Sequence, residues 1–175
     1  MAVRPIRLYG DPVLRRQAAL VTRFDESLER VVTDLLETCR LPGRAGLAAP
    51  QIGVSLRVFS YFVDGDEGYV VNPVLVALEG QQEGDEGCLS VPELFLPTTR
   101  AERAVVTGVD MANRPVEVEG TGLMARCLQH EVDHLDGHLY LDRLAPEHRK
   151  QAMKWVREHQ IGSTTAGTAL GGGRR

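Results

Sequence analysis

The chain has 175 residues, 43% of them hydrophobic and 25% charged, with a net charge of −4 at pH 7. These values are ordinary for one globular domain and argue against a general nucleic-acid binder. No apolar run approaches the roughly 18 residues of a membrane span, and the amino-terminal residues, interrupted by arginines and prolines, do not look like a signal peptide. Because the three cysteines are an odd number without such a signal, we expect reduced thiols and a cytoplasmic protein.

The first half of the chain is predicted to contain one helix and two strands. Apolar residues recur at helical spacing over residues 25–39, where an initial aspartate can cap the helix. Strands are expected over 56–63 and 69–78, separated by an Asp-Gly-Asp turn, and an Asn-Pro pair predicts a kink or a sheet edge in the second. The polar, glycine-rich residues 79–87 predict a loop.

The second half predicts two strands followed by two helices. The strands are expected over 101–110 and 115–119, and the helices over 122–135 and 146–160, the latter opened by a proline. An order of helix, strands, helix and helix indicates an α+β fold rather than alternating β and α elements.

The end of the chain differs from the rest in composition and charge. A single domain is expected over residues 1–160, and the glycine-rich residues 161–175 are expected to be a disordered tail. Residues 146–175 hold six Lys+Arg and two Asp+Glu, a local charge of +4, whereas residues 1–145 carry −8. A basic end on an acidic body can be attracted to RNA, or it can be only a solvated face.

The most informative stretch is HEVDH, residues 130–134, in the predicted helix 122–135. Side chains four positions apart on a helix point the same way, so His130 and His134 can bind one metal ion. Glu131 can then reach a water on the metal without being a ligand, and can move its proton. The alternative is two surface histidines on a charged helix.

A catalytic metal site needs a third protein ligand and an open position. Downstream of the motif there is no G-x-x-H arrangement, and few residues remain. Upstream, Cys88 lies beside a glycine at the end of the predicted loop, where a thiolate can approach the metal. Cys39 and Cys127 lie on apolar helical faces and are expected to pack as small hydrophobic residues. Cys88 is therefore the candidate third ligand.

A third stretch, GRAGLAAPQIG at residues 43–53, contains small residues that let a backbone approach a ligand closely. Its Gln51 offers an N–H₂ donor, which can stabilise an oxyanion without competing for the metal. Alone, this stretch predicts no more than a tight loop.

Taken together, RAGLAAPQ (44–51), EGCLS (86–90) and QHEVDHLDG (129–137) resemble the three motifs of the peptide deformylase family. The second and third motifs match in full, and the first differs at Arg44, where the family usually has glycine. Weaker similarity extends over nearly all of the chain except the tail. The resemblance implies an α+β fold with small antiparallel sheets around the helix that carries H-E-x-x-H.

The resemblance also implies an activity, which is removal of the N-formyl group from the formylmethionine of newly made polypeptides, with release of formate. One divalent metal ion would be held by Cys88, His130 and His134. Fe²⁺ is expected in the cell and Zn²⁺, Ni²⁺ or Co²⁺ as substitutes, and the ligand set itself suits zinc or ferrous iron. The expected partners are N-formylmethionyl peptides and nascent chains, with the ribosome approached through the basic carboxy-terminal region, and no membrane.

By the same resemblance, the oxyanion is met by the metal, the Gln51 side chain and the backbone N–H of Leu89. Glu131 takes the proton of the attacking water and delivers it to the leaving amine. The backbone at Gly46 is expected to align the substrate as an added strand. Arg126, one turn before the first histidine, is expected at the rim of the methionine pocket, unless it is a surface arginine.

Further residues are expected to support the site. The family pairs the glutamate of the second motif with an arginine in a later strand, which Glu86 and Arg100 match, although two solvated charges are the alternative. Asp133 is expected to orient part of the helix.

Two other functions compete with the deformylase. A small zincin-type metallopeptidase is disfavoured by the surroundings of Cys88 and by the missing downstream ligand. A structural metal module is disfavoured because such sites usually have four protein ligands.

Overall fold

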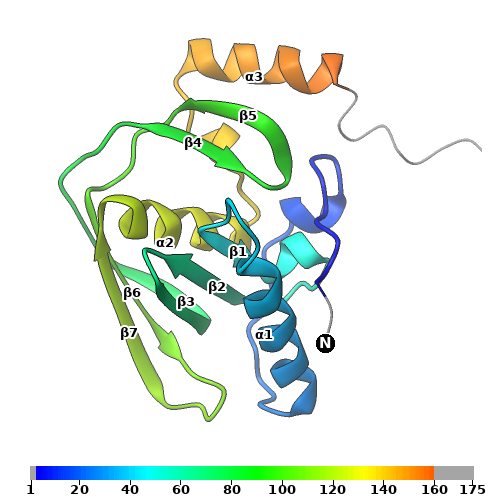
Figure 1. Ribbon diagram of the computed structural model, residues 1–175, viewed down its shortest axis with the longest axis vertical. Coiled ribbons are helices and arrows are strands. Elements are labelled where there is room, and N and C mark those ends of the chain that lie inside the picture. The colour runs from blue at the N-terminus through cyan, green and yellow to red at the C-terminus, as the bar shows by residue number, and fades with distance from the viewer. Residues whose placement is uncertain (1–2, 160–175) are drawn as a thin grey trace, which may run out of the picture.

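The computed structural model describes residues 3–159, which form an α+β architecture (Figure 1). Over these residues the elements are, in chain order, η1 (Pro12–Arg15), α1 (Glu26–Cys39), β1 (Gly46–Ala48), η2 (Ala49–Ile52), β2 (Val58–Val63), β3 (Asp66–Glu79), β4 (Asp85–Cys88), β5 (Val91–Pro97), β6 (Arg103–Val109), β7 (Pro115–Thr121), α2 (Gly122–Leu135), η3 (Tyr140–Asp142) and α3 (Pro146–Glu158), where η denotes a short 3₁₀ helix. None of the helices in this part of the chain is both long and apolar enough to span a membrane.

The strands form two antiparallel sheets on either side of α2. Five strands pair in the order β1-β2-β3-β6-β7, and β4 and β5 pair separately as a hairpin. Helix α2 packs on the larger sheet, the hairpin crosses its other side, α3 lies beyond the hairpin, and α1 lies beside β1 and β2 (Figure 1). The predicted α+β fold with small antiparallel sheets around this helix is therefore confirmed.

Three clusters of buried apolar side chains hold these layers together. The first lies between α2 and the larger sheet and includes Phe59, Leu128 and Leu135. The second packs α1 against β1, β2 and η2, around Leu35. The third joins the hairpin, η3 and α3 around Tyr140. The first cluster fixes the helix that carries the H-E-x-x-H motif against the larger sheet.

Helix α2 spans the predicted residues 122–135. Its apolar positions, at spacings of three and four, turn to the sheet and are buried: Ala125, Leu128, Val132 and Leu135. Gly137 follows the helix with a φ of 78°, and a Cβ there would lie 2.9 Å from the carbonyl oxygen of Arg15. Glycine at this position therefore ends the helix and admits the amino-terminal segment.

Two local predictions in the first half are confirmed. Asp25 caps α1 by accepting a hydrogen bond from the backbone N–H of Ser27 at 3.0 Å. The predicted kink in β3 is a register shift between Val71 and Val74. There Asn72 has a φ of 52° and its amide bonds the backbone of residue 21 at 2.8 and 2.9 Å, which ties the amino-terminal segment to the sheet.

The segment 79–97 differs from its prediction. Residues 79–87 are not one loop, because Glu79 ends β3 and residues 85–88 form β4. Strand β5 was not expected, and its sequence contains Pro92 and Pro97, which disfavour a strand. Both prolines are exposed, and β5 pairs only with β4, so the missing N–H groups disrupt no second partner.

The segment 43–53 is more ordered than the tight loop that was expected, since it forms β1 and η2. At the other end, α3 covers residues 146–158 of the helix predicted for 146–160. The predicted disordered tail at 161–175 lies outside the described residues.

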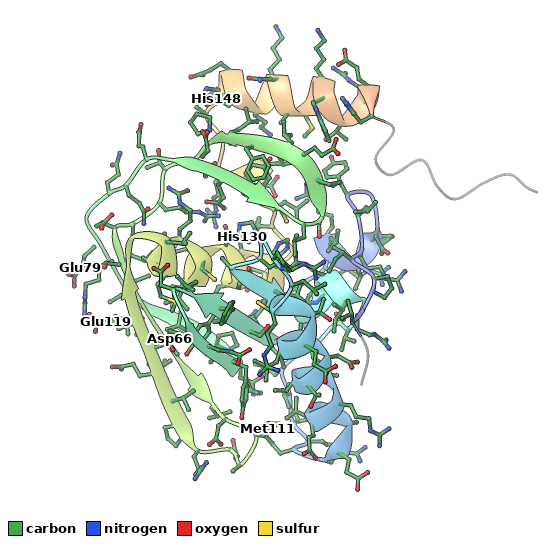
Figure 2. The ribbon with its side chains drawn as sticks, viewed as in Figure 1. Asp66, Glu79, Met111, Glu119, His130 and His148 are labelled. Carbon is green, nitrogen blue, oxygen red and sulfur yellow. The ribbon has the colours of Figure 1, made fainter. Side chains whose placement is uncertain are left out.

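Side chains over the whole of this structure are drawn in Figure 2. His130 lies in the middle of the molecule, between the larger sheet and the hairpin, whereas the labelled carboxylates Glu79 and Glu119 lie at the outer side of the sheet (Figure 2). The H-E-x-x-H motif is thus an interior feature of the fold, and the alternative of two surface histidines is wrong.

Candidate metal centre and active site

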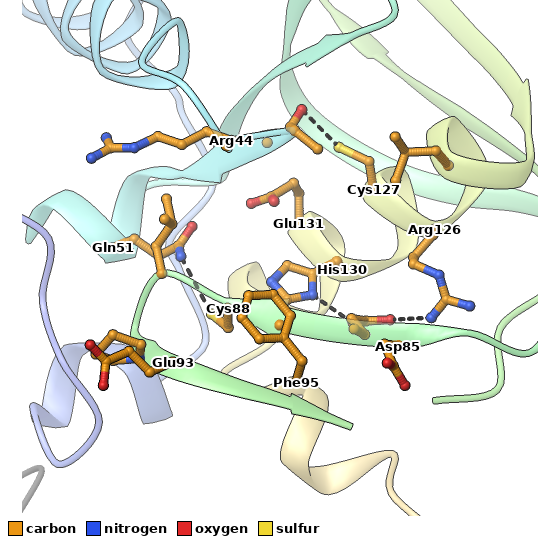
Figure 3. Close-up of a pocket in the computed structure, with 18 residues that line it drawn as sticks. Arg44, Gln51, Asp85, Cys88, Glu93, Phe95, Arg126, Cys127, His130 and Glu131 are labelled. Atoms are coloured by element: carbon orange, nitrogen blue, oxygen red, sulfur yellow. Dashed lines mark hydrogen bonds and ion pairs between the residues drawn. The ribbon is translucent and has the colours of Figure 1, made fainter. Parts of the chain in front are cut away.

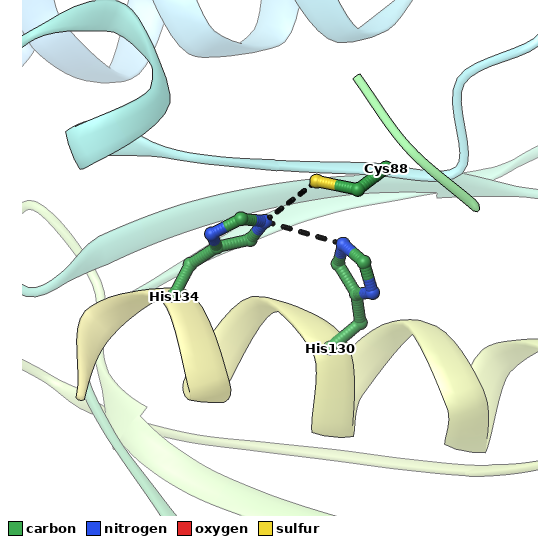
Figure 4. Close-up of side chains that lie close together, drawn as sticks. All are labelled: Cys88, His130 and His134. Carbon is green, nitrogen blue, oxygen red and sulfur yellow. Dashed lines mark hydrogen bonds between the residues drawn. The ribbon is translucent and has the colours of Figure 1, made fainter. Parts of the chain in front are cut away.

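Three side chains that the sequence singles out as ligands lie together. The Sγ of Cys88 is 3.2 Å from the Nε2 of His134, which is 3.2 Å from the Nε2 of His130 (Figure 4). All three ligand atoms lie within 4.8 Å of one another. Two imidazole nitrogens that both present lone pairs repel at this distance, and a cation among them and the thiolate removes the repulsion. One sulfur and two imidazole donors fit Zn²⁺ or Fe²⁺.

Glu86 orients the first of these histidines. Its Oε1 lies 2.6 Å from the Nδ1 of His130, so a hydrogen on Nδ1 leaves Nε2 free to bind a metal. The same carboxylate accepts hydrogen bonds from the Nε and Nη2 of Arg100, at 3.0 and 2.6 Å. Burial alone would raise the pKa of Glu86, but the hydrogen bonds from Arg100 and His130 outweigh it and hold that pKa well below its usual range. The carboxylate beside the imidazole therefore stays charged.

Cys88 reaches the histidines because β4 ends beside α2. The expectation that it lies in a loop is wrong, since it is the last residue of β4 and follows a register shift after Gly87. A Cβ on Gly87 would lie 2.4 Å from the ring of Phe95 on β5, so glycine lets the two strands close around the cysteine. The hairpin thereby presents the thiol to the helix.

A cavity of about 390 Å³ opens beside the three ligands. Its walls come from the segment before β1, from β4 and β5, and from α2 (Figure 3). The structure brings to this cavity every residue to which the resemblance gives a catalytic or substrate role: Gly46, Gln51, Leu89, Arg126 and Glu131. Residues from three distant parts of the sequence therefore share one pocket.

Glu131 is buried in the wall of this pocket, with 3% of its surface exposed. Among the described residues its Oε2 has no hydrogen-bond partner. Burial raises the pKa of Glu131 to about 7, with the charge of Glu86 adding to the rise and His130 opposing it. A carboxyl group with a pKa near neutrality can both accept and donate a proton under physiological conditions.

Gln51 presents its amide nitrogen to the metal centre. The Oε1 of this buried side chain accepts a hydrogen bond from the backbone N–H of Ala48 at 2.9 Å, which fixes the orientation of the amide. Its Nε2 therefore points to the Sγ of Cys88, at 3.7 Å, and to the Oγ of Ser90, at 3.4 Å. An N–H₂ donor held in this way can stabilise negative charge that develops beside the thiolate.

Two arginines at the pocket have different surroundings. Arg126 is 7% exposed, so the alternative of a surface arginine is wrong, and its Nη1 donates to the Oε2 of Glu86 at 2.8 Å. Arg44, which replaces the usual glycine, donates to the backbone oxygen of Thr38 at 2.8 Å and is not among the residues with positive φ. This position therefore does not require glycine for its backbone conformation.

Two contacts of the ligands were not foreseen. The backbone N–H of Ser90 donates to the Sγ of Cys88 at 3.4 Å. The ring of Tyr140 stacks against the ring of His130, with 6.4 Å between centroids. Ser90 ends the EGCLS motif, which was an available signal, whereas nothing in the sequence around Tyr140 pointed to the centre.

Asp133 has the partners that the sequence left unassigned. It accepts hydrogen bonds from Arg100 at 2.7 Å and from Arg143 at 2.6 and 3.1 Å. The Oε1 of Gln129 accepts a hydrogen bond from the backbone N–H of Ala101, and its Nε2 donates one to the backbone oxygen of Ala101, both at 3.0 Å. Both side chains fasten α2 to the chain that follows the hairpin.

The combination of a buried glutamate, an amide donor and a convergent Cys/His/His group in one pocket defines a metal-dependent hydrolase. Comparisons with known proteins agree. Residues 3–150 match the model of the polypeptide deformylase family. A peptide deformylase of Acidothermus cellulolyticus is 58% identical over 94% of this chain and 92% of its own length.

Solved structures give the same result. The peptide deformylase of Legionella pneumophila superposes with a TM-score of 0.84 at 41% identity, covering 91% of this chain and 96% of that one. For the peptide deformylase of Thermus thermophilus the TM-score is 0.83 at 46% identity, covering 89% of this chain and 94% of that one.

The chain belongs to the polypeptide deformylase family. It is a hydrolase that removes the N-formyl group from new polypeptides, as the three motifs implied. The alternative of a small zincin-type metallopeptidase is not favoured. The family is one of metalloenzymes, and the Cys/His/His group could hold the ion.

Proposed function

We propose that Cys88, His130 and His134 hold one divalent metal ion and that Glu131 is the proton-transfer group of the deformylation. The observation that carries the proposal is the convergence of the three ligand atoms within 4.8 Å, beside a cavity lined by a buried carboxylate without a partner among the described residues. A structural site would instead be closed by a fourth protein ligand.

The bound metal would polarise the formyl carbonyl and make a water nucleophilic at neutral pH. The amide N–H₂ of Gln51 donates a hydrogen bond to the growing oxyanion, and the backbone N–H of Leu89 donates a second one. Glu131 accepts a proton from the attacking water and transfers it to the departing nitrogen as the C–N bond breaks, and a pKa of about 7 suits both transfers. The products are formate and a free amino terminus.

The substrate is proposed to bind as an extended peptide beside β1. This strand is an edge of the larger sheet, and Gly46 lies on it at the wall of the pocket. An edge strand offers backbone groups to an added strand, and the cavity accepts the methionine side chain. The aliphatic part of Arg126 is proposed as one wall of that subsite.

We propose Fe²⁺ as the ion in the cell, with Zn²⁺, Ni²⁺ or Co²⁺ able to replace it. The support is chemical, because one thiolate and two imidazoles bind all of these borderline divalent ions. Metal analysis of protein prepared without oxygen distinguishes them.

N-formylmethionyl nascent chains are the proposed substrates, and the proposed place of the reaction is therefore the cytoplasm, at the ribosome. Helix α3 exposes four basic side chains, Arg149, Lys150, Lys154 and Arg157. Because the rest of the chain is acidic, this helix is the part that RNA would attract. Salt-sensitive cosedimentation with ribosomes tests the idea, and its absence leaves α3 as a solvated face.

The decisive test compares formate release from a formylmethionyl peptide with internal cleavage of the same peptide without its formyl group. Glu131→Gln is expected to keep the metal while its turnover falls by roughly 10²–10⁴, the usual worth of general acid–base catalysis. Glu117→Gln, an exposed carboxylate on β7, is the matched control. Full activity in Glu131→Gln contradicts the assignment, and internal cleavage supports a peptidase instead.

A further inference from the structure

Arg126 lies buried between α2 and the β4–β5 hairpin, and its guanidinium bonds three separate segments of the chain. The Nη1 donates to the Oε2 of Glu86 at 2.8 Å and to the backbone oxygen of Thr98 at 2.9 Å. The Nη2 donates to the Oε1 of Gln82 at 3.4 Å. Gln82 precedes β4, Glu86 lies on it, and Thr98 follows β5. One side chain of the helix thus connects to both ends of the hairpin.

The carboxylate that Arg126 contacts is the one that orients a ligand histidine. The Oε1 of Glu86 meets the Nδ1 of His130 at 2.6 Å, whereas its Oε2 receives Arg126. Arg126 and His130 are four residues apart on α2, so one helix holds both oxygens of this carboxylate. Two points of attachment fix how the carboxylate is rotated relative to the helix, which one contact cannot do.

Arg100 does not replace this attachment. It bonds Glu86 from the chain that follows the hairpin, and it reaches α2 at Asp133, at 2.7 Å. Arg100 bonds both oxygens of Glu86, at 3.0 and 2.6 Å, but it reaches the helix only through Asp133, whereas Arg126 and His130 bond the carboxylate directly from α2. Because Glu86 and Arg126 are 4% and 7% exposed, their hydrogen bonds are weakly screened by solvent and hold their geometry.

We infer that Arg126 is a positioning residue of the metal centre, which acts through Glu86 to hold the imidazole of His130 in its metal-binding orientation. The inference rests on the proposed assignment of His130 as a ligand. The guanidinium of Arg126 thus has a role separate from that of the aliphatic stem, which is proposed as a wall of the methionine subsite. Removing an outer partner of a ligand typically costs 10–100-fold in metal affinity or activity.

The test uses Arg126→Met, which keeps an unbranched apolar stem and removes the guanidinium, and Arg126→Lys, which keeps the charge but not the forked donors. Affinity for Co²⁺ is measured by competition with a chelator, and the absorption of the thiolate–cobalt bond reports the geometry. In Arg126→Met we expect Co²⁺ affinity to fall by about 10-fold or more, with a shifted absorption. We expect kcat for a formylmethionyl peptide to fall while KM changes little, and Arg126→Lys to be intermediate.

Arg103→Met is the matched control, because Arg103 also bonds two carboxylates, Glu79 and Glu119, but on the larger sheet. Unchanged Co²⁺ affinity and absorption in Arg126→Met, with only KM raised, would overturn the inference and leave Arg126 as a pocket wall. If Arg126→Met does not fold, Arg126→Lys decides by the same measurements. Intact Co²⁺ binding in His130→Ala would instead refute the ligand assignment itself.

Discussion

Replacing Gly46 by alanine is the change that tests most directly whether the position of Glu131 determines the rate. A Cβ on Gly46 would lie 2.4 Å from the Oε1 of Glu131, 2.8 Å from its Cδ and 2.7 Å from the Sγ of Cys127. Ordinary contact begins at 3.4 Å, and both of these neighbours are buried. The carboxylate must therefore move by about 1 Å, and a misplacement of that size can cost about 10²-fold in rate.

A loss of about 10²-fold in kcat/KM corresponds to about 2.7 kcal/mol of transition-state stabilisation. The three atoms nearest to the new methyl group belong to Glu131 and Cys127, and not to a ligand side chain, so metal content is expected to stay at its original value. Formate release is measured over a range of formylmethionyl peptide concentrations, together with metal bound per chain. Gly84→Ala is the control, since its Cβ would meet its nearest neighbour, the Nη2 of Arg126, at an ordinary 3.5 Å.

Activity close to that of the original chain in Gly46→Ala would refute the reasoning, because it would mean that the carboxylate tolerates displacement or has no part in the slow step. An equal loss in Gly84→Ala would show that any added methyl group near the pocket is harmful. Loss of metal in Gly46→Ala would show that the strain spreads to the ligands.

Three further predictions follow from the site and the tail. Removing residues 161–175 should leave formate release from short peptides intact, and loss of that activity would make the segment part of the fold. Protein purified without oxygen should contain iron and lose activity in peroxide, because Fe²⁺ and the Cys88 thiolate both oxidise, while a nickel form survives longer; zinc alone with peroxide-resistant activity contradicts this. Burial would raise the pKa of Asp133, but Arg143 and Arg100 lower it below 3.8. The ion pairs of Asp133 therefore stabilise the fold above about pH 3.8, and this contribution is lost as the pH falls through the lowered pKa. The melting temperature of metal-free Asp133→Asn should accordingly fall less on acidification than that of the metal-free original chain.

The helices could be predicted from the sequence because each has a strong local pattern. In α2 the apolar positions and the terminal Gly137 indicate the same bounds, and the structure has those bounds. The spacing of His130 and His134 then follows from helical geometry alone. The fold class followed from the order of elements and from the family motifs.

The hairpin could not be predicted, because what stabilises it is not local. Pro92 and Pro97 disfavour a strand, yet β5 needs bonds to one neighbour only, and the packing of Phe95 on Gly87 is a cross-strand contact. The orientation of Arg126 was missed for a similar reason. Helical spacing gives the face on which a side chain lies, but the direction of a long guanidinium depends on the buried carboxylate it finds, here Glu86.

The split of the three ligands between a hairpin and a helix has a consequence for how the chain folds. Cys88 and His134 are 46 positions apart in sequence, and β5, β6, β7 and most of α2 lie between them. Contacts across such separations form late, because the intervening chain must first lose its freedom. The time at which Co²⁺ binds during refolding therefore reports when the hairpin packs against the helix. We expect it to lag behind the helical signal in circular dichroism, which reports α1, α2 and α3 as each becomes ordered.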